Sequence, residues 1–105
     1  MSGILIVRAQ VINGALKQQF DEWYEREHLP DAKRAFGAAR AWRAWSDMDA
    51  MVHYAFYEFG TVDLARAAAI SPQIESLIAD FDATWSDGIT RTREIVERVQ
   101  TLHDQ

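Results

Sequence analysis

FDEWYEREHLPD, residues 20–31, is the one stretch of this sequence in which aromatic, acidic, basic, imidazole and proline side chains are arranged for more than packing. Within and just before it, Leu16, Phe20 and Trp23 recur at spacings of three and four residues. This spacing places the three side chains on one face of a helix, as an apolar stripe. The stretch therefore predicts a helix that packs against a β-sheet.

Pro30 interrupts this helix, because proline has no N–H to donate and its ring crowds the carbonyl of the residue four positions earlier. Proline also disfavours helical backbone angles at Leu29, the residue before it. We expect the helix to kink or break at residues 28–29. Since proline is tolerated in the first turn of a helix, residues 31–36 can resume as helix, with Gly37 as a left-handed terminator.

His28 stands at this expected break, with Tyr24 one helical turn before it and Asp31 three residues after it. An imidazole titrates near neutral pH, and Asp31 or Glu27 could orient it. We therefore predict His28, Asp31 and Tyr24 as catalytic residues lining a cleft, with His28 as general acid or base. Two alternatives stay open: His28 caps carbonyl groups exposed at the break, and Tyr24 packs in the core with or without a hydrogen bond to His28.

The size and composition of the chain exclude several classes of protein. With 105 residues we expect a single domain, spanning 1–105. The net charge of −5 argues against a nucleic-acid partner, which is bound by clustered Lys and Arg. The chain has no cysteine, which excludes thiol catalysis and fits a reducing cytoplasm. No segment approaches the length of a membrane span and the start has no basic leader, so we expect a soluble cytoplasmic protein without a membrane partner.

Three strands are predicted in the first 60 residues. Residues 4–11 are rich in β-branched side chains and have apolar residues at both odd and even positions. This pattern indicates a central strand that is covered on both faces. Residues 39–46 are bounded by Gly37 and by a turn at 47–49, a length typical of a strand, although helix is an alternative. Residues 51–59 are rich in aromatic side chains and form the third strand. The second and third strands then make a hairpin.

Two further helices follow this hairpin. Thr61 is suited to the N-cap of a short helix over residues 62–70. Ser71 as N-cap and Pro72 in the first turn restart a second helix. Its apolar stripe is formed by Ile74, Leu77, Ile78, Phe81 and Trp85.

The last element completes the fold. Residues 86–88 are predicted to form a turn. Residues 89–99 have charged side chains at both odd and even positions, which suits an edge strand. Helix is the alternative there, because Ile95, Val96 and Val99 also fit a helical stripe. With a strand, the order of elements predicts an α+β, ferredoxin-like βαββαβ fold with a four-stranded antiparallel sheet and helices on one face.

The hairpin supplies aromatic side chains that could line an apolar pocket for a ring-shaped ligand. The predicted ligand-binding set is Trp23, Trp42, Trp45, His53, Tyr54 and Arg43. For the aromatic residues the alternative is packing in the core or in an interface between subunits. A buried arginine needs an anion, either a group on the ligand or an internal carboxylate such as Glu58 or Glu94.

The sequence indicates neither a metal nor a cofactor. Its three histidines lie in different elements, without the spacing of metal ligands on adjacent helical turns. It contains no phosphate-binding loop and no serine nucleophile motif. It does indicate a partner: strands 4–11 and 51–59 are apolar on both faces, so the face without helices needs cover, and a two-fold homodimer is the simplest way to supply it.

WYEREHLPD, residues 23–31, at the end of a first helix in a chain of this length and element order, resembles the EthD-like family of the dimeric α/β-barrel superfamily. The resemblance covers nearly the whole chain at the level of fold and residues 20–31 at the level of the motif. It implies a dimer whose two sheets form a barrel, a pocket between sheet and helices in each subunit, and His28 as the functional residue. Because the superfamily holds cofactor-independent monooxygenases, isomerases and proteins without assigned activity, the resemblance does not select a chemistry.

Two classes of function follow from these observations. The first is a small cofactor-independent enzyme that acts on an aromatic or polyketide-like compound, with His28 carrying a proton. The second is a non-catalytic dimeric protein that binds a ligand or serves as an accessory subunit. A sizeable cavity reaching His28 favours the enzyme, whereas a filled core with His28 in open solvent favours the accessory protein.

Overall fold

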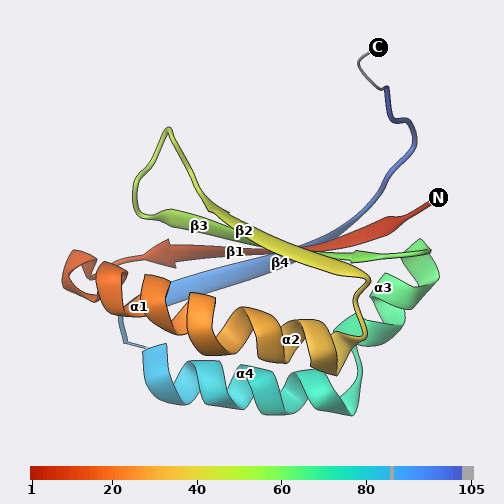
Figure 1. The fold of residues 1–105 in the computed structure, drawn as a ribbon. Coiled ribbons are helices and arrows are strands. Elements are labelled where there is room, and N and C mark those ends of the chain that lie inside the picture. The colour runs from red at the N-terminus through yellow and green to blue at the C-terminus, as the bar shows by residue number, and fades with distance from the viewer. Residues whose placement is uncertain (86, 103–105) are drawn as a thin grey trace.

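The computed structural model describes residues 1–85 and 87–102 (Figure 1). Ser86 of the predicted turn and residues 103–105 of the tail lie outside the described residues. In chain order the elements are β1 (Gly3–Val11), the 3₁₀ turn η1 (Gly14–Leu16), α1 (Lys17–Trp23), the π-helical turn η2 (Tyr24–His28), α2 (Leu29–Phe36), β2 (Arg40–Trp45), β3 (Val52–Phe59), α3 (Val62–Ala69), α4 (Pro72–Trp85) and β4 (Ile89–Glu97).

The four strands form one antiparallel sheet in the order β2-β3-β1-β4. Figure 1 shows α1, α2 and α4 in a layer on one face of this sheet and α3 at one end of it. The predicted α+β, ferredoxin-like fold is therefore confirmed. Residues 39–46 and 89–99 were the two segments with a helical alternative, and both contain edge strands, β2 and β4.

Of the kink or break predicted at residues 28–29, the break is wrong, because helix continues from Lys17 to Phe36. Its middle is the π-helical turn η2, in which the Leu29 N–H donates to the carbonyl of Tyr24, five residues back. His28 and Leu29 keep right-handed helical angles, and Pro30 occupies the first turn of α2. A wider π turn inside an α-helix shifts the hydrogen-bond register, which accommodates a residue without an N–H.

The end of this helix is as predicted. Gly37 has a φ of 69° and a ψ of 29°, the left-handed conformation that glycine adopts at low cost. Its N–H donates to the carbonyl of Arg34, and the N–H of Ala38 donates to that of Lys33. The chain thereby reverses into β2. The predicted N-cap at Thr61 is also present, since its hydroxyl accepts a hydrogen bond from the Leu64 N–H at 3.2 Å.

An aromatic cluster fills the space between the sheet and the helices. Phe20 is fully buried at its centre, with ring centroids 5.3 to 6.3 Å from those of its neighbours. These neighbours are Trp23, Tyr24, Trp45, His53, Phe81 and Trp85. Phe20 and Trp23 from the stripe predicted on the first helix thus meet Phe81 and Trp85 from the stripe predicted on α4.

The inward face of the first helix differs from the predicted stripe. Phe20, Tyr24, His28 and Ala32 are its buried residues, whereas Leu16 and Trp23 are only partly buried and pack at the margin of the core. The π turn explains this difference, because a turn that holds more residues keeps side chains four positions apart on one side. The stripe predicted from the sequence assumed that the helix is an undistorted α-helix up to Pro30.

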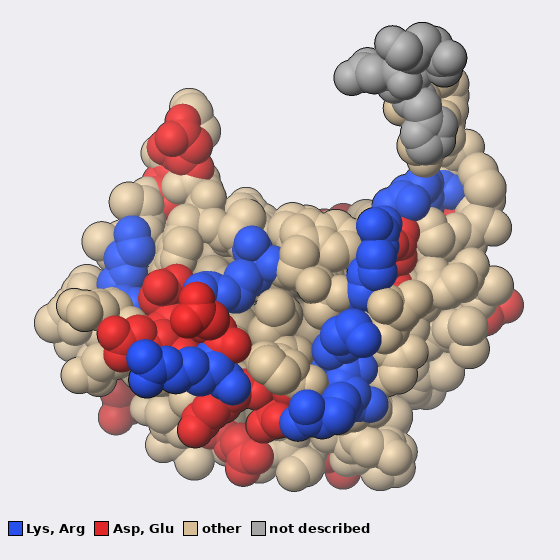
Figure 2. All heavy atoms as spheres, viewed as in Figure 1, with Lys and Arg blue, Asp and Glu red and all other residues tan. Residues whose placement is uncertain are grey.

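The face of the sheet away from the helices carries the alternate residues of each strand. Trp42 stacks on Phe56 with centroids 5.2 Å apart, and Tyr54 stacks on the other side of Phe56 at 6.1 Å. Glu58 lies at the end of this face and pairs with Arg40 at 2.6 Å and with Arg98 at 2.8 Å. Figure 2 shows this side of the molecule as a hollow of mainly neutral residues between the β2–β3 loop and the segment after β4.

No helix among the described residues has the length and apolar character that crossing a membrane would require.

We predict that Phe20→Ala lowers the free energy of unfolding by about 3 to 5 kcal/mol, because it empties the centre of the aromatic cluster. Trp23→Ala should cost less, since part of its indole already faces solvent. Urea unfolding of the two variants measures both values. A larger loss for Trp23→Ala than for Phe20→Ala would contradict this placement of the two rings.

Candidate functional site

A groove of about 310 Å³ runs between the middle of the first helix and α4. Its lining comes from two elements that pack side by side, α4 on one wall and the η2 turn with its flanks on the other. The lining residues are Trp23, Glu27, His28, Asp31, Leu77, Asp80, Ala83 and Thr84. The groove is therefore built at the π turn.

His28 forms the inner part of this lining and is 7% exposed. Its ring stacks on the indole of Trp23, with centroids 4.5 Å apart and an interplanar angle of 19°, and meets Tyr24 edge-on at 4.8 Å. Within the described residues the imidazole makes no hydrogen bond. Because His28 lines the groove, its ring nitrogens are open to water or to a ligand group that enters there.

Burial, and then the positive charge of Arg91, lower the pKa of His28 from 6.5 to about 4. Asp31 acts in the opposite direction. His28 is therefore a neutral imidazole at pH 7, with one nitrogen that can accept a proton and one that can donate a hydrogen bond.

The other two predicted catalytic residues lie on opposite sides of His28. Asp31 lines the groove, but its side chain is 54% exposed and pairs with Arg34 on the same helix. Tyr24 lies behind His28, 1% exposed, and shares a hydrogen bond with Tyr57 of β3. Burial raises the pKa of Tyr24 to about 12, so its phenol stays protonated.

Arg91 is a residue that the sequence analysis missed. It projects from β4 toward the helices, with its guanidinium carbon 3.9 Å from the ring centroid of Phe81 and an ion pair to Asp82 at 3.3 Å. Together with His28 and Tyr57 it borders a small inner cavity of about 20 Å³. The positive charge of Arg91 thus lies on the inner side of His28. The sequence does not indicate this position, because Arg91 is one of several charged residues on an edge strand.

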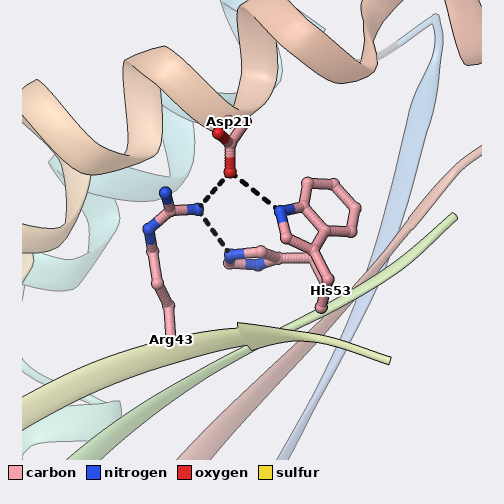
Figure 3. A network of polar contacts seen from close by, with 4 residues as sticks. Asp21, Arg43 and His53 are labelled. Atoms are coloured by element: carbon pink, nitrogen blue, oxygen red, sulfur yellow. Dashed lines mark hydrogen bonds and ion pairs between the residues drawn. The ribbon is translucent and has the colours of Figure 1, made fainter. Parts of the chain in front are cut away.

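A second polar cluster lies near the start of the first helix (Figure 3). Asp21 accepts hydrogen bonds at 2.8 Å from both the Arg43 guanidinium and the Trp45 indole N–H. These bonds, that of Trp45 first, lower the pKa of Asp21. Arg43 also approaches Nε2 of His53 at 3.3 Å. The anion that Arg43 needs is therefore Asp21, and neither Glu58 nor Glu94.

His53 is the innermost member of this cluster and is completely buried. Burial, and then the charge of Arg43, lower its pKa to about 4. Because arginine can only donate, Nε2 of His53 accepts and the neutral ring carries its hydrogen on Nδ1. That Nδ1 has no hydrogen-bond partner within the described part of the chain.

The structure divides the predicted ligand-binding set among three places. Trp23 lines the groove. Trp45, His53 and Arg43 form the inner cluster with Asp21, away from the groove. Trp42 and Tyr54 lie on the face of the sheet without helices, where they stack on Phe56.

The opposite wall of the groove was also missed by the sequence analysis. Leu77, Asp80 and Thr84 follow one another at spacings of three and four on α4, which places them on one line of the helix. This spacing was visible in the sequence, but nothing there placed that line of α4 beside His28. Which residues face this line of α4 across the groove depends on how α4 packs against the first helix.

No family model and no curated protein matches this sequence. Several solved structures do match. SnoaB, a cofactor-independent oxygenase from Streptomyces nogalater, is 16% identical with a TM-score of 0.69, over 98% of each chain. An EthD family protein from Bacillus halodurans is 18% identical with a TM-score of 0.70, over 94% of this chain and 100% of the other. HapK from Hahella chejuensis is 12% identical with a TM-score of 0.69, over 100% of this chain and 99% of the other.

These similarities define the class of protein at the level of fold: the chain shares the α+β, ferredoxin-like fold of SnoaB and of the EthD family protein. The fold-level resemblance suggested by residues 20–31 is confirmed, since an EthD family protein is among the structures that share it. At identities of 12 to 18% the similarity establishes a shared fold, and the chemistry has to be argued from the groove.

We predict that stability falls as the pH is lowered from about 6.5 toward 4. The pKa values of His28 and His53 are lower in the folded chain than in the unfolded chain, so the unfolded chain binds more protons in this window. Their contribution is complete above pH 6.5 and is lost as the pH approaches 4. Each pKa unit is worth about 1.4 kcal/mol, so the loss is on the order of 3 kcal/mol for each ring.

Urea unfolding at several pH values between 7.5 and 4.5 measures this loss. A free energy of unfolding that stays constant over this range would contradict the burial of both rings. NMR titration of the His28 ring in the folded protein tests the same point directly, since a midpoint near 6.5 would place that ring in solvent.

Proposed function

We propose that this protein is a small cofactor-independent enzyme that acts on an aromatic or polyketide-like compound, with His28 as the proton carrier. The observation that carries the proposal is a buried imidazole without a hydrogen-bond partner among the described residues, lining a groove large enough for a small ligand. The fold shared with SnoaB, a cofactor-independent oxygenase, supports this class of chemistry.

The environment of His28 determines what the ring can do. A neutral imidazole in this position accepts a proton from an acidic C–H or O–H of the ligand. Protonating the buried imidazole of His28 costs free energy, because the charged ring is poorly solvated. The anion left on the ligand offsets part of this cost when it lies against the imidazolium. The charge of Asp31 also favours the charged ring, whereas the charge of Arg91 disfavours it. Tyr24 acts as a positioning residue, because it holds the edge of the imidazole.

We further propose that the protein is a homodimer joined through the face of the sheet without helices. Ile4, Ile6, Tyr54 and Phe56 lie on this face and are neither fully buried nor fully exposed. Trp42 beside them is 37% exposed. A two-fold partner is the simplest cover for such a surface, and the shared dimeric α/β-barrel fold supports it.

A second candidate function is a non-catalytic ligand-binding or accessory protein. One observation favours it: the interior between sheet and helices is filled by the aromatic cluster, and the inner cavity beside His28 measures only about 20 Å³. In that case a ligand occupies the groove without reacting.

We predict that the protein accelerates hydrogen–deuterium exchange at an activated C–H of an aromatic ketone, such as 2-tetralone, in D₂O. His28→Gln should reduce this acceleration by about 10²- to 10⁴-fold, as expected when a general base is removed. His53→Gln is the matched control, because it removes the other buried imidazole away from the groove and should lower stability while the exchange persists. NMR signal loss measures the exchange, and a ketone that binds at the groove without exchange would favour the accessory protein.

We predict a sedimenting species of about twice the chain mass of 12.0 kDa at micromolar concentration. Phe56→Glu should yield monomers, because it buries a charge at the proposed interface. Ile70→Glu, at a position 84% exposed after α3, serves as control and should leave the dimer intact. A monomeric wild-type protein would contradict the proposed interface.

A further inference from the structure

The groove beside His28 is lined by three carboxylates, those of Glu27, Asp31 and Asp80, and by neither Lys nor Arg among the described residues. Glu27 lies on η2, Asp31 on α2 and Asp80 on α4, so the negative charges come from both walls. In Figure 2 acidic side chains gather over the part of the helical layer where α1 lies, with basic side chains beside them. The groove therefore has a strongly negative rim.

Arg26 lines a neighbouring hollow with Trp23 and Glu27, outside the lining of the groove, and two other cations near the rim are already paired. Arg34 pairs with Asp31, and Arg91 pairs with Asp82 on the inner side of His28. Glu27 and Asp80 form no ion pair within the described residues, so their charges remain available to a ligand. The described residues hold no group of three His, Asp or Glu side chains arranged to bind a metal ion.

The floor of the groove gives a second and independent sign of a ligand. His28 is more than nine-tenths buried, lines the groove and has no hydrogen-bond partner in the described chain. The indole of Trp23 lies against it and also lines the groove. An aromatic surface beside carboxylates is the environment in which proteins recognise organic cations.

We propose that the ligand of this groove carries a cationic nitrogen, held at the rim by Glu27 and Asp80, on an aromatic or other apolar body that reaches Trp23 and His28. This inference rests on the proposed function, because it assumes that the groove is the ligand site, and it specifies the substrate class. A cationic group also makes neighbouring C–H and O–H bonds more acidic, which assists proton transfer to a histidine of low pKa.

Three indole probes of nearly equal shape test the sign of this charge. Tryptamine carries an ammonium group, tryptophol is neutral and indole-3-propionate carries a carboxylate. We expect tryptamine to bind most tightly and indole-3-propionate most weakly, as measured by the NMR shifts of the His28 ring and the Trp23 indole N–H in the intact protein at low salt. The preference for tryptamine should weaken as salt screens the exposed carboxylates.

Charge-removing variants locate the contact. Glu27→Gln and Asp80→Asn should each weaken tryptamine binding by roughly two- to fivefold, the range of exposed ion pairs, and leave tryptophol binding unchanged. Glu75→Gln is the matched control, because it removes an equal charge from α4 outside the lining of the groove. Equal weakening by Glu75→Gln would overturn the contact, since it would show an effect of net charge alone.

The outcomes separate this inference from the proposed function. If tryptophol or indole-3-propionate binds as well as tryptamine and shifts the His28 ring, the groove is a ligand site and the cationic preference is overturned. If none of the probes shifts either ring at millimolar concentration, the groove is not a site for aromatic ligands, and both proposals are overturned.

Discussion

A change of backbone hydrogen-bond register, in which the N–H of Leu29 donates to the carbonyl five residues earlier, organises the functional half of this molecule. It defines the π-helical turn that lets the first helix pass Pro30 without breaking. It also keeps Phe20, Tyr24 and His28 on one side of the helix, so the imidazole is carried into the aromatic core. With an undistorted α-helix the line of these side chains would drift around the axis, and the groove would lose its inner wall.

Much of the fold could be predicted from the sequence, because most of it follows from local rules. Strand alternation, the hairpin, the Thr61 cap and the terminating Gly37 each depend on a few neighbouring residues. The strand at 89–99 was distinguishable from helix only through the order of the other elements, since its own pattern fitted both. The break predicted at Pro30 was wrong for a specific reason. The rule that proline breaks a helix assumes α-helical hydrogen-bond register, whereas a change to π-helical register lets the neighbouring backbone groups form hydrogen bonds in another way.

The candidate site was predictable only in part. His28, Asp31 and Trp23 were identified because they are close in sequence, and the structure places all three at the groove. Asp80 and Arg91 come from elements far along the chain, and their approach depends on the packing of α4 and β4 against the first helix. Asp21 was missed for the same reason, since its partners Arg43 and Trp45 lie more than twenty residues away. The chemical character of a site residue can thus be predicted from its neighbours in sequence, whereas the partner of a charged residue cannot.

The ion pairs of Glu58 have a consequence for the motions of the sheet. Arg40 belongs to one edge strand and Arg98 directly follows the other, so the two edges of the sheet are joined through one carboxylate on β3, one of the two strands between them. The N–H of Arg98 also extends the ladder by donating to the carbonyl of Ser2. At this end the sheet is therefore held across its width by Glu58, and fraying of either edge breaks one of its two ion pairs. At the opposite end β2 is held instead to the first helix, through the bonds of Arg43 and Trp45 to Asp21, so the β2–β3 loop beyond Trp45 is the part that opens more readily.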